Sequence, residues 1–103
     1  MLFMLVFMHF VGDFALQNDF VAKAKNPRLS SKEIWPVVML AHCFIHAGLV
    51  FTVTHNLMAA LVVLVLHFVT DYAKCMGLFG DRYSFMIDQA IHISLLIAIA
   101  GIV

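Results

Sequence analysis

Residues 9–15 of the chain read HFVGDFA, and residues 67–73 read HFVTDYA. Both stretches lie inside long apolar runs, and each places a histidine and an aspartate four residues apart. Ionisable side chains are costly inside a lipid bilayer, where they usually face other protein groups and mark a functional site. The two stretches therefore raise two questions: whether the chain lies in a bilayer, and which groups these polar side chains bind.

The composition indicates which solvent surrounds the chain. Of the 103 residues, 64% are hydrophobic and 12% are charged, and the mean hydropathy is +1.03. Soluble domains contain about 25% charged residues, so this composition is typical of an integral membrane protein. The apolar sequence divides into four runs of about the 17–25 residues that a spanning helix needs, near 1–18, 33–54, 56–75 and 84–102. We predict an all-α fold in which residues 1–103 form a single membrane domain, a bundle of four transmembrane helices.

The basic residues predict how this bundle is oriented. The second connection, around His55, contains no Lys or Arg, and all six cations lie in or beside the other two connections: Lys23, Lys25, Arg28, Lys32, Lys74 and Arg82. Positive residues mark the cytoplasmic side of a membrane protein. We therefore expect a multi-pass protein of the inner (cytoplasmic) membrane, surrounded by membrane lipid, with both termini outside.

Each predicted helix contains one pair of polar residues at the spacing i, i+4. The spacing places both side chains of a pair on one helix face, one turn apart. Counted from the cytoplasmic end, the aspartates form one layer and the histidines a deeper one, so the pairs reach a common level. Helix bundles bind metal ions with such inward-facing side chains. The eight predicted metal ligands are His9, Asp13, His42, His46, His67, Asp71, Asp88 and His92.

A network held by hydrogen bonds alone is the alternative to a metal site. Each aspartate at a helix centre costs about 2.5–3.5 kcal/mol on insertion scales, so three unpaired carboxylates cost about 8–10 kcal/mol. Structural zinc sites return about 10–16 kcal/mol, which offsets that cost. We favour divalent metal ions, two in number, with zinc preferred and iron or manganese as alternatives. One ion with hydrogen-bonded partners around it remains open.

The two opening stretches also indicate an internal repeat. They share five of seven residues, and each is followed by a helix with a polar pair that ends in Ile-His. We predict that the first two helices form one hairpin and the last two its copy. Because both hairpins start and end outside, they are parallel repeats about an axis along the membrane normal.

The order of these motifs resembles a known family. The pattern is His9-x-x-x-Asp13-x-x-x-Gln17, then His42 and His46, then His67-x-x-x-Asp71-x-x-Lys74 and Asp88-Gln89-x-x-His92. It is similar to a family of small polytopic bacterial and phage inner-membrane proteins that is catalogued as a domain of unknown function. The resemblance covers nearly the whole chain. The family is itself loosely similar to proposed membrane-bound metal-dependent hydrolases. It implies a small multi-pass membrane protein and assigns no catalytic residue.

A metal-dependent hydrolase is the favoured function. Two ions lower the pKa of a bound water and hold the oxygens of a phosphoester-type or lipid-linked substrate. Gln17, Lys74 and Gln89 lie nearer the basic surface and are expected to contact the ligands or the substrate. Nearby cations suit an anionic lipid or another phosphate-bearing molecule, and we expect no nucleic-acid partner.

Two other functions remain open. A histidine-rich di-iron centre would make the chain a membrane oxidoreductase. Intramembrane Asp and His are also common in transporters and ion-binding modules, so a metal-ion transporter is the third class. The residues on the outer side of the ligand layer are mainly apolar, which favours a pocket with one opening over a channel. The sequence leaves the oligomeric state open.

Overall fold

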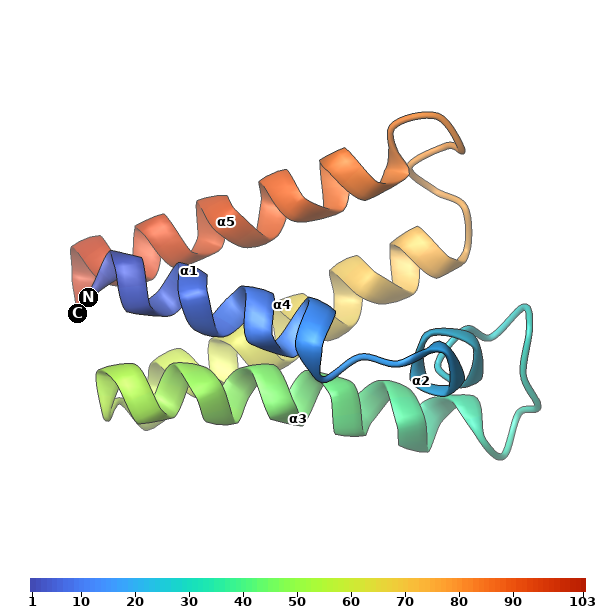
Figure 1. Cartoon of the computed structure of the whole chain (residues 1–103), viewed down its shortest axis with the longest axis horizontal. Helices are drawn as coiled ribbons and strands as arrows, with labels where there is room; N and C mark the ends of the chain where they lie inside the picture. Colours follow the sequence, from blue (N-terminus) through green and yellow to red (C-terminus); the bar gives the residue numbers. More distant parts are fainter.

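A computed structural model describes residues 1–103 and confirms an all-helical fold without strands. In Figure 1 the long helices run side by side, both termini lie at one end, and a short helix lies at the other end with two of the loops. The elements in chain order are α1 (Leu2–Phe10), the π-helix η1 (Val11–Ala15), α2 (Asp19–Ala24), α3 (Trp35–Thr54), α4 (Leu57–Cys75) and α5 (Ser84–Ile102).

Three helices are long and apolar enough to cross a membrane. These are α3 with 20 residues and α4 and α5 with 19 residues each. Their bounds differ by at most two residues from the predicted runs 33–54, 56–75 and 84–102. Asn56 begins α4 by accepting a hydrogen bond from the Ala59 backbone N–H at 3.0 Å, as a helix N-cap does. The chain thus has the helices of a membrane protein.

The prediction of a fourth spanning helix at 1–18 is wrong. The helical segment Leu2–Ala15 is shorter than the other three, and it rises only about 20 Å against a hydrocarbon core of about 30 Å. The chain leaves the helix after Ala15, and the Asn18 side chain accepts a hydrogen bond from the Val21 backbone N–H at 2.9 Å. This cap starts α2 and turns the chain at the point where a longer helix was expected.

The four main helices enclose a core that has two parts. α1 contacts α3 and α5, and α4 contacts the same two helices, so the packing forms a closed ring. One apolar cluster consists of Leu5, Val50, Ala59, Val63, Leu96 and Ile99. Met39, Cys43 and Cys75 form a second cluster. Many large apolar side chains remain exposed on the outside, as expected for a surface that faces lipid.

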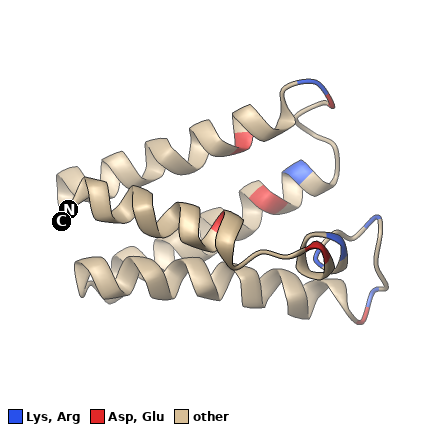
Figure 2. Cartoon of the chain, viewed as in Figure 1, with Lys and Arg blue, Asp and Glu red and all other residues tan.

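The charged residues are distributed unevenly along the bundle. Figure 2 shows Lys and Arg near the end opposite the termini, while Asp13, Asp71 and Asp88 lie within η1, α4 and α5. The two similar stretches differ in backbone, because HFVGDFA crosses from α1 into η1 and HFVTDYA lies within the regular helix α4. The internal repeat and the side of the membrane that each end faces stay predictions.

Candidate metal centre

The structure brings all eight predicted ligands into one cluster. Each of the four helices contributes two of them, with α1 and η1 taken as one helical segment. Seven of the eight residues are buried, and the side chain of the eighth, Asp13, is 11% exposed. The spacing i, i+4 therefore located a set of side chains that meet in the interior.

Asp13 lies at the centre of this cluster. Its Oδ1 atom is 2.8 Å from His46 Nε2, 3.5 Å from His42 Nε2 and 3.8 Å from His67 Nε2. Its Oδ2 atom is 3.2 Å from His9 Nε2. One carboxylate thus faces four imidazole rings that come from three helices.

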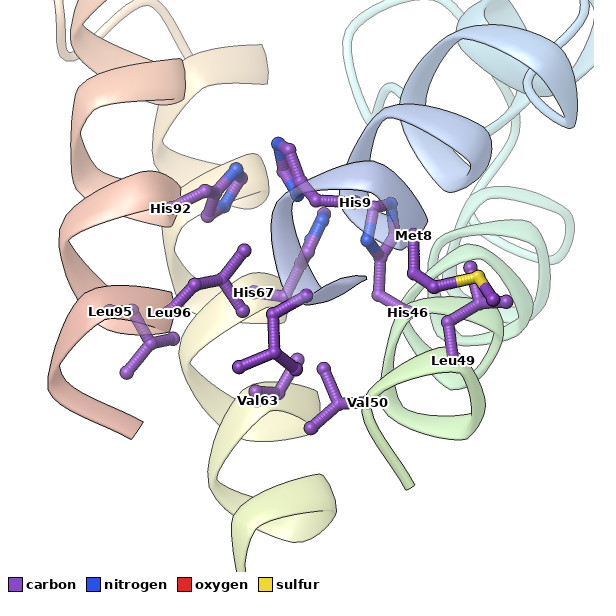
Figure 3. Close-up of a pocket in the computed structure, with 11 residues that line it drawn as sticks. Met8, His9, His46, Leu49, Val50, Val63, His67, His92, Leu95 and Leu96 are labelled. Carbon is purple, nitrogen blue, oxygen red and sulfur yellow. The ribbon is translucent and has the colours of Figure 1, made fainter. Parts of the chain in front are cut away.

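The histidine rings pack against one another. The ring centroids of His46 and His67 are 4.0 Å apart, and those of His67 and His92 are 4.1 Å apart in a stacked arrangement. Figure 3 shows the rings of His9, His46, His67 and His92 together on one side of a small cavity, with apolar side chains on the other side. This packing places several ring nitrogens close together in the protein interior.

Several of these buried polar atoms have no hydrogen-bond partner. They are Nε2 of His42, His46 and His67, both ring nitrogens of His92, and Oδ1 of Asp88. His46 Nε2 is close to Asp13 but does not meet it in hydrogen-bonding geometry. Buried polar groups in native proteins are nearly always paired, so this cluster of unpaired atoms is a candidate binding site.

The ligand atoms fall into three overlapping groups, in each of which all atoms lie within 4.8 Å of one another. In a tetrahedral zinc site with bonds of 2.0–2.1 Å, ligand atoms are about 3.3–3.4 Å apart. The distances from Asp13 Oδ1 to three imidazoles, 2.8 to 3.8 Å, bracket that value. These three distances are compatible with the geometry of a zinc site. The groups are His9, Asp13, His46 and His67; His42, His67 and Asp71; and Asp13, Asp88 and His92.

Two lysines neutralise two of the three carboxylates. Lys25 follows α2, is buried, and donates a hydrogen bond from Nζ to Asp71 Oδ2 at 2.6 Å. Lys74 Nζ lies 3.4 Å from Asp88 Oδ2. Asp13 has only histidines as cationic partners. Lys25 is one of the cations from which the topology was predicted, and nothing in its sequence position marks it as a site residue.

Gln89 connects three members of the cluster. Its Nε2 atom donates to Asp13 Oδ2 at 2.9 Å and to Asp88 Oδ2 at 3.3 Å. Its Oε1 atom is 3.0 Å from His9 Nε2, so this nitrogen is already occupied, unlike those of the other four histidines. Gln17 contacts only the backbone carbonyl of Asp13, at 3.4 Å. Gln89 and Lys74 therefore lie beside the predicted ligands, and Gln17 lies further out.

A glycine allows the close approach between η1 and α3. A Cβ atom at Gly12 would lie 2.7 Å from Cε1 and 2.8 Å from Nε2 of His46. Real Cβ contacts are essentially never that short, so the ring occupies space that any other residue would fill. Gly12 also lies in the π-helical turn, a feature that frequently occurs at functional sites.

The space next to the cluster differs between its two sides. A polar cavity of about 260 Å³ extends from it past Lys25 and Lys74 toward the end of the bundle that carries the loops. On the opposite side, apolar residues of the first core cluster leave a cavity of only about 10 Å³. The arrangement is a polar pocket with a closed, histidine-lined end.

The comparison with family models confirms that the chain belongs to a family catalogued as a domain of unknown function. The model described as "Protein of unknown function (DUF3307)" matches residues 1–103, so the chain belongs to this family. No curated protein and no solved structure matches the chain.

Proposed function

Because the description of this family states no function, we propose one from the geometry of the site: the chain is a membrane-embedded hydrolase that uses divalent metal ions. The ions would bind in the eight-residue cluster, and the substrate would be a phosphoester. The observation that carries the proposal is the set of unpaired imidazole nitrogens around Asp13 at the closed end of a polar pocket. Such a donor set is typical of zinc, with iron and manganese as alternatives.

The charges in the cluster support a cation beside Asp13. Asp71 and Asp88 each have a lysine partner, whereas the neighbours of Asp13 are imidazoles and the Gln89 amide. A buried carboxylate without a compensating charge is strongly destabilising. A divalent ion held by Asp13, His46 and His67, with His42 as a further ligand, would supply that charge.

Asp13 is also suited to be shared by two ions. Its Oδ1 atom faces His42, His46 and His67. Asp13 also offers a ligand atom within 4.8 Å of ligand atoms of Asp88 and His92. The three carboxylates and two ammonium groups leave one net negative charge. One divalent ion makes the cluster positive, and a second ion adds repulsion that an anion can offset. We therefore propose one tightly bound ion and a second that binds together with the anionic substrate.

These ions would supply an activated water and hold the oxygens of the phosphoester. The protein side chains have separate tasks. Lys74, whose side chain is 27% exposed at the cavity, can contact a phosphate oxygen. Gln89 holds Asp13 and Asp88 at a fixed separation through its amide.

The orientation in the membrane follows from the basic residues. The cations lie near the end opposite the termini (Figure 2), so we place the loops and the cavity on the cytoplasmic side of the inner membrane and both termini outside. The first crossing then consists of the short α1 and η1, an irregular segment at residues 16–18, and α2. Irregular backbone at membrane depth is tolerated where it lines a water-filled cavity, and Gln17 and Asn18 line this one. Two parallel hairpins remain our interpretation of the repeat.

The alternatives have less support. A transporter needs a path through the membrane, and the apolar core cluster closes the outer side of the histidines. A di-iron oxidoreductase would use the same ligands, so the identity of the bound metal separates it from a hydrolase.

Metal analysis of the purified protein tests the proposal. We expect at least one zinc ion per chain in the wild type, loss of it in Asp13→Asn, and unchanged content in Asp81→Asn, whose side chain is exposed. Zinc-loaded protein should hydrolyse a phosphomonoester such as p-nitrophenyl phosphate, and chelator-treated protein should not. A wild type that neither contains nor takes up a divalent metal would refute the proposal, and bound iron with a near-ultraviolet oxo-bridge band would favour the oxidoreductase.

A further inference from the structure

The polar cavity extends between η1 and α5, because residues of both elements line it. The backbone of α5 lies close to the backbones of α1 and α4 and further from those of η1 and α2. Two side chains of α5 reach η1, since Gln89 donates to Asp13 and the Phe85 ring meets that of Phe14. In Figure 1 the first turns of α5 lie away from the segment that joins η1 to α2. The cavity occupies this region, because residues from η1, α2, α4 and α5 all line it. Phe14 of η1 and Phe85 of α5 line the cavity here and are half exposed, so we take this side of the cavity as its opening toward lipid.

Two phenyl rings form the rim of this opening. Phe14 comes from η1 and Phe85 from α5, and both line the otherwise polar cavity. Their ring centroids are 6.1 Å apart in an edge-to-face arrangement. The two residues are 54% and 51% exposed, so the outer faces of the rings are available to a ligand or to lipid. Phenyl rings offer apolar contact and no hydrogen bond.

Inside the rim the cavity is polar and suited to an anion. Lys74 is accessible there, Lys25 lies deeper against Asp71, and the proposed ions add positive charge next to both. Its volume of about 260 Å³ is below the 300–1,000 Å³ of pockets that enclose drug-sized ligands. The cavity therefore has room for a polar headgroup and not for a long apolar tail.

From this combination of an apolar rim and a cationic interior we propose that the substrate is a phosphate group carried on an apolar tail, and that it enters from the membrane between η1 and α5. The phosphate reaches Lys74 and the ligand cluster, while the tail stays outside and contacts Phe14 and Phe85. The inference rests on the proposed function, since it identifies the substrate class of the same site.

Binding of matched ligands to the zinc-loaded protein in detergent tests the inference. Native mass spectrometry in the cold would compare three probes: phosphatidic acid, glycerol 3-phosphate, which has the phosphate without tails, and phosphatidylcholine, which has tails without a phosphomonoester. We expect phosphatidic acid to bind at least about tenfold more tightly than either of the others, the gain that one buried phenyl-sized contact gives.

Two double variants and one single variant test where the tail and the phosphate contact the protein. In Phe14→Ala/Phe85→Ala the preference for phosphatidic acid over glycerol 3-phosphate should fall to near unity. The control is Phe3→Ala/Phe7→Ala, which removes another exposed ring pair, with centroids 6.5 Å apart, near the N-terminus. Lys74→Gln should weaken both phosphate probes to the same extent.

Three results would overturn the inference: equal binding of phosphatidic acid and glycerol 3-phosphate, equal binding of phosphatidylcholine, or a preference that survives loss of both rim rings. Metal content measured on the same samples keeps the two proposals apart. Bound zinc without a tail effect removes only the lateral entry, whereas a wild type without metal refutes the hydrolase itself. Metal content equal to that of the wild type also shows that the ring variants are folded.

Discussion

Replacing Lys25 with methionine tests whether one buried ion pair fastens the first loop to the bundle. Lys25 Nζ lies 2.6 Å from Asp71 Oδ2, and the two side chains are 5% and 2% exposed. Removing one partner of such a pair leaves the other charge buried and uncompensated, which costs about 3–5 kcal/mol. For a protein of about 100 residues, 1 kcal/mol shifts Tm by about 4–8 °C. We expect Lys25→Met to lower Tm by more than about 10 °C, measured by circular dichroism in detergent.

A double-mutant cycle separates the lost pair from lost packing. Asp71→Asn alone leaves the ammonium group buried without its partner and should also destabilise. Lys25→Met/Asp71→Asn removes both charges. Its loss of stability should therefore be smaller than the summed losses of the two single variants by more than about 1 kcal/mol. Added zinc should stabilise Lys25→Met more than the wild type, because an ion can supply the missing positive charge. A single variant within about 0.5 kcal/mol of wild type, or strictly additive effects, would refute the reasoning.

Three further predictions follow from other features. Gly12→Ala should push the His46 ring aside and weaken zinc binding at least about tenfold in competition with a chelating dye, while Gly48→Ala, where a Cβ meets open space, should leave it unchanged. Leu96→Ala should lower the free energy of unfolding by about 2–5 kcal/mol in a detergent titration, because Leu96 is 3% exposed in the main core cluster. The control Ile97→Ala, at a 53% exposed position, should change it by no more than about 0.5 kcal/mol. Equal losses in the two variants would contradict the core assignment. A strong chelator should lower the Tm of the wild type and zinc should restore it; a Tm that is indifferent to both would count against a resident ion.

The sequence predicted the convergence of the eight polar residues because that property depends on local geometry. A spacing of i, i+4 fixes one helix face, and helices of equal length that alternate in direction bring the faces of Asp71 and Asp88 to a common depth. Exposing these polar faces to lipid is costly, so they turn toward the interior of the bundle. The three long helices were predicted to within two residues for the same reason, since length and hydropathy determine them.

The first helix shows where such reasoning fails. Hydropathy treats residues 1–18 as one run. It does not register that the Asn18 side chain accepts a hydrogen bond from the Val21 N–H and so starts a new helix where the first was expected to continue. The π-helical turn that contains Asp13 is likewise a local departure that composition does not reveal.

Lys25 could not have been identified from sequence. Its burial depends on α2 packing against α3, a tertiary contact that brings a loop cation to an aspartate 46 positions away. Sequence patterns assign loop lysines to solvent, because most of them are there. Gln89 was accessible to prediction, since it directly follows Asp88 and extends from the same part of α5.

The shortness of α1 and η1 has a consequence for the bilayer itself. An apolar segment that rises about 20 Å cannot match a hydrocarbon layer of about 30 Å, and such hydrophobic mismatch is relieved by local thinning of the membrane. Thinning on this flank would draw lipid headgroups below their usual level. The protein would then thin the bilayer next to α1 and η1, where its apolar segment is shortest, and a thicker membrane would stabilise it less.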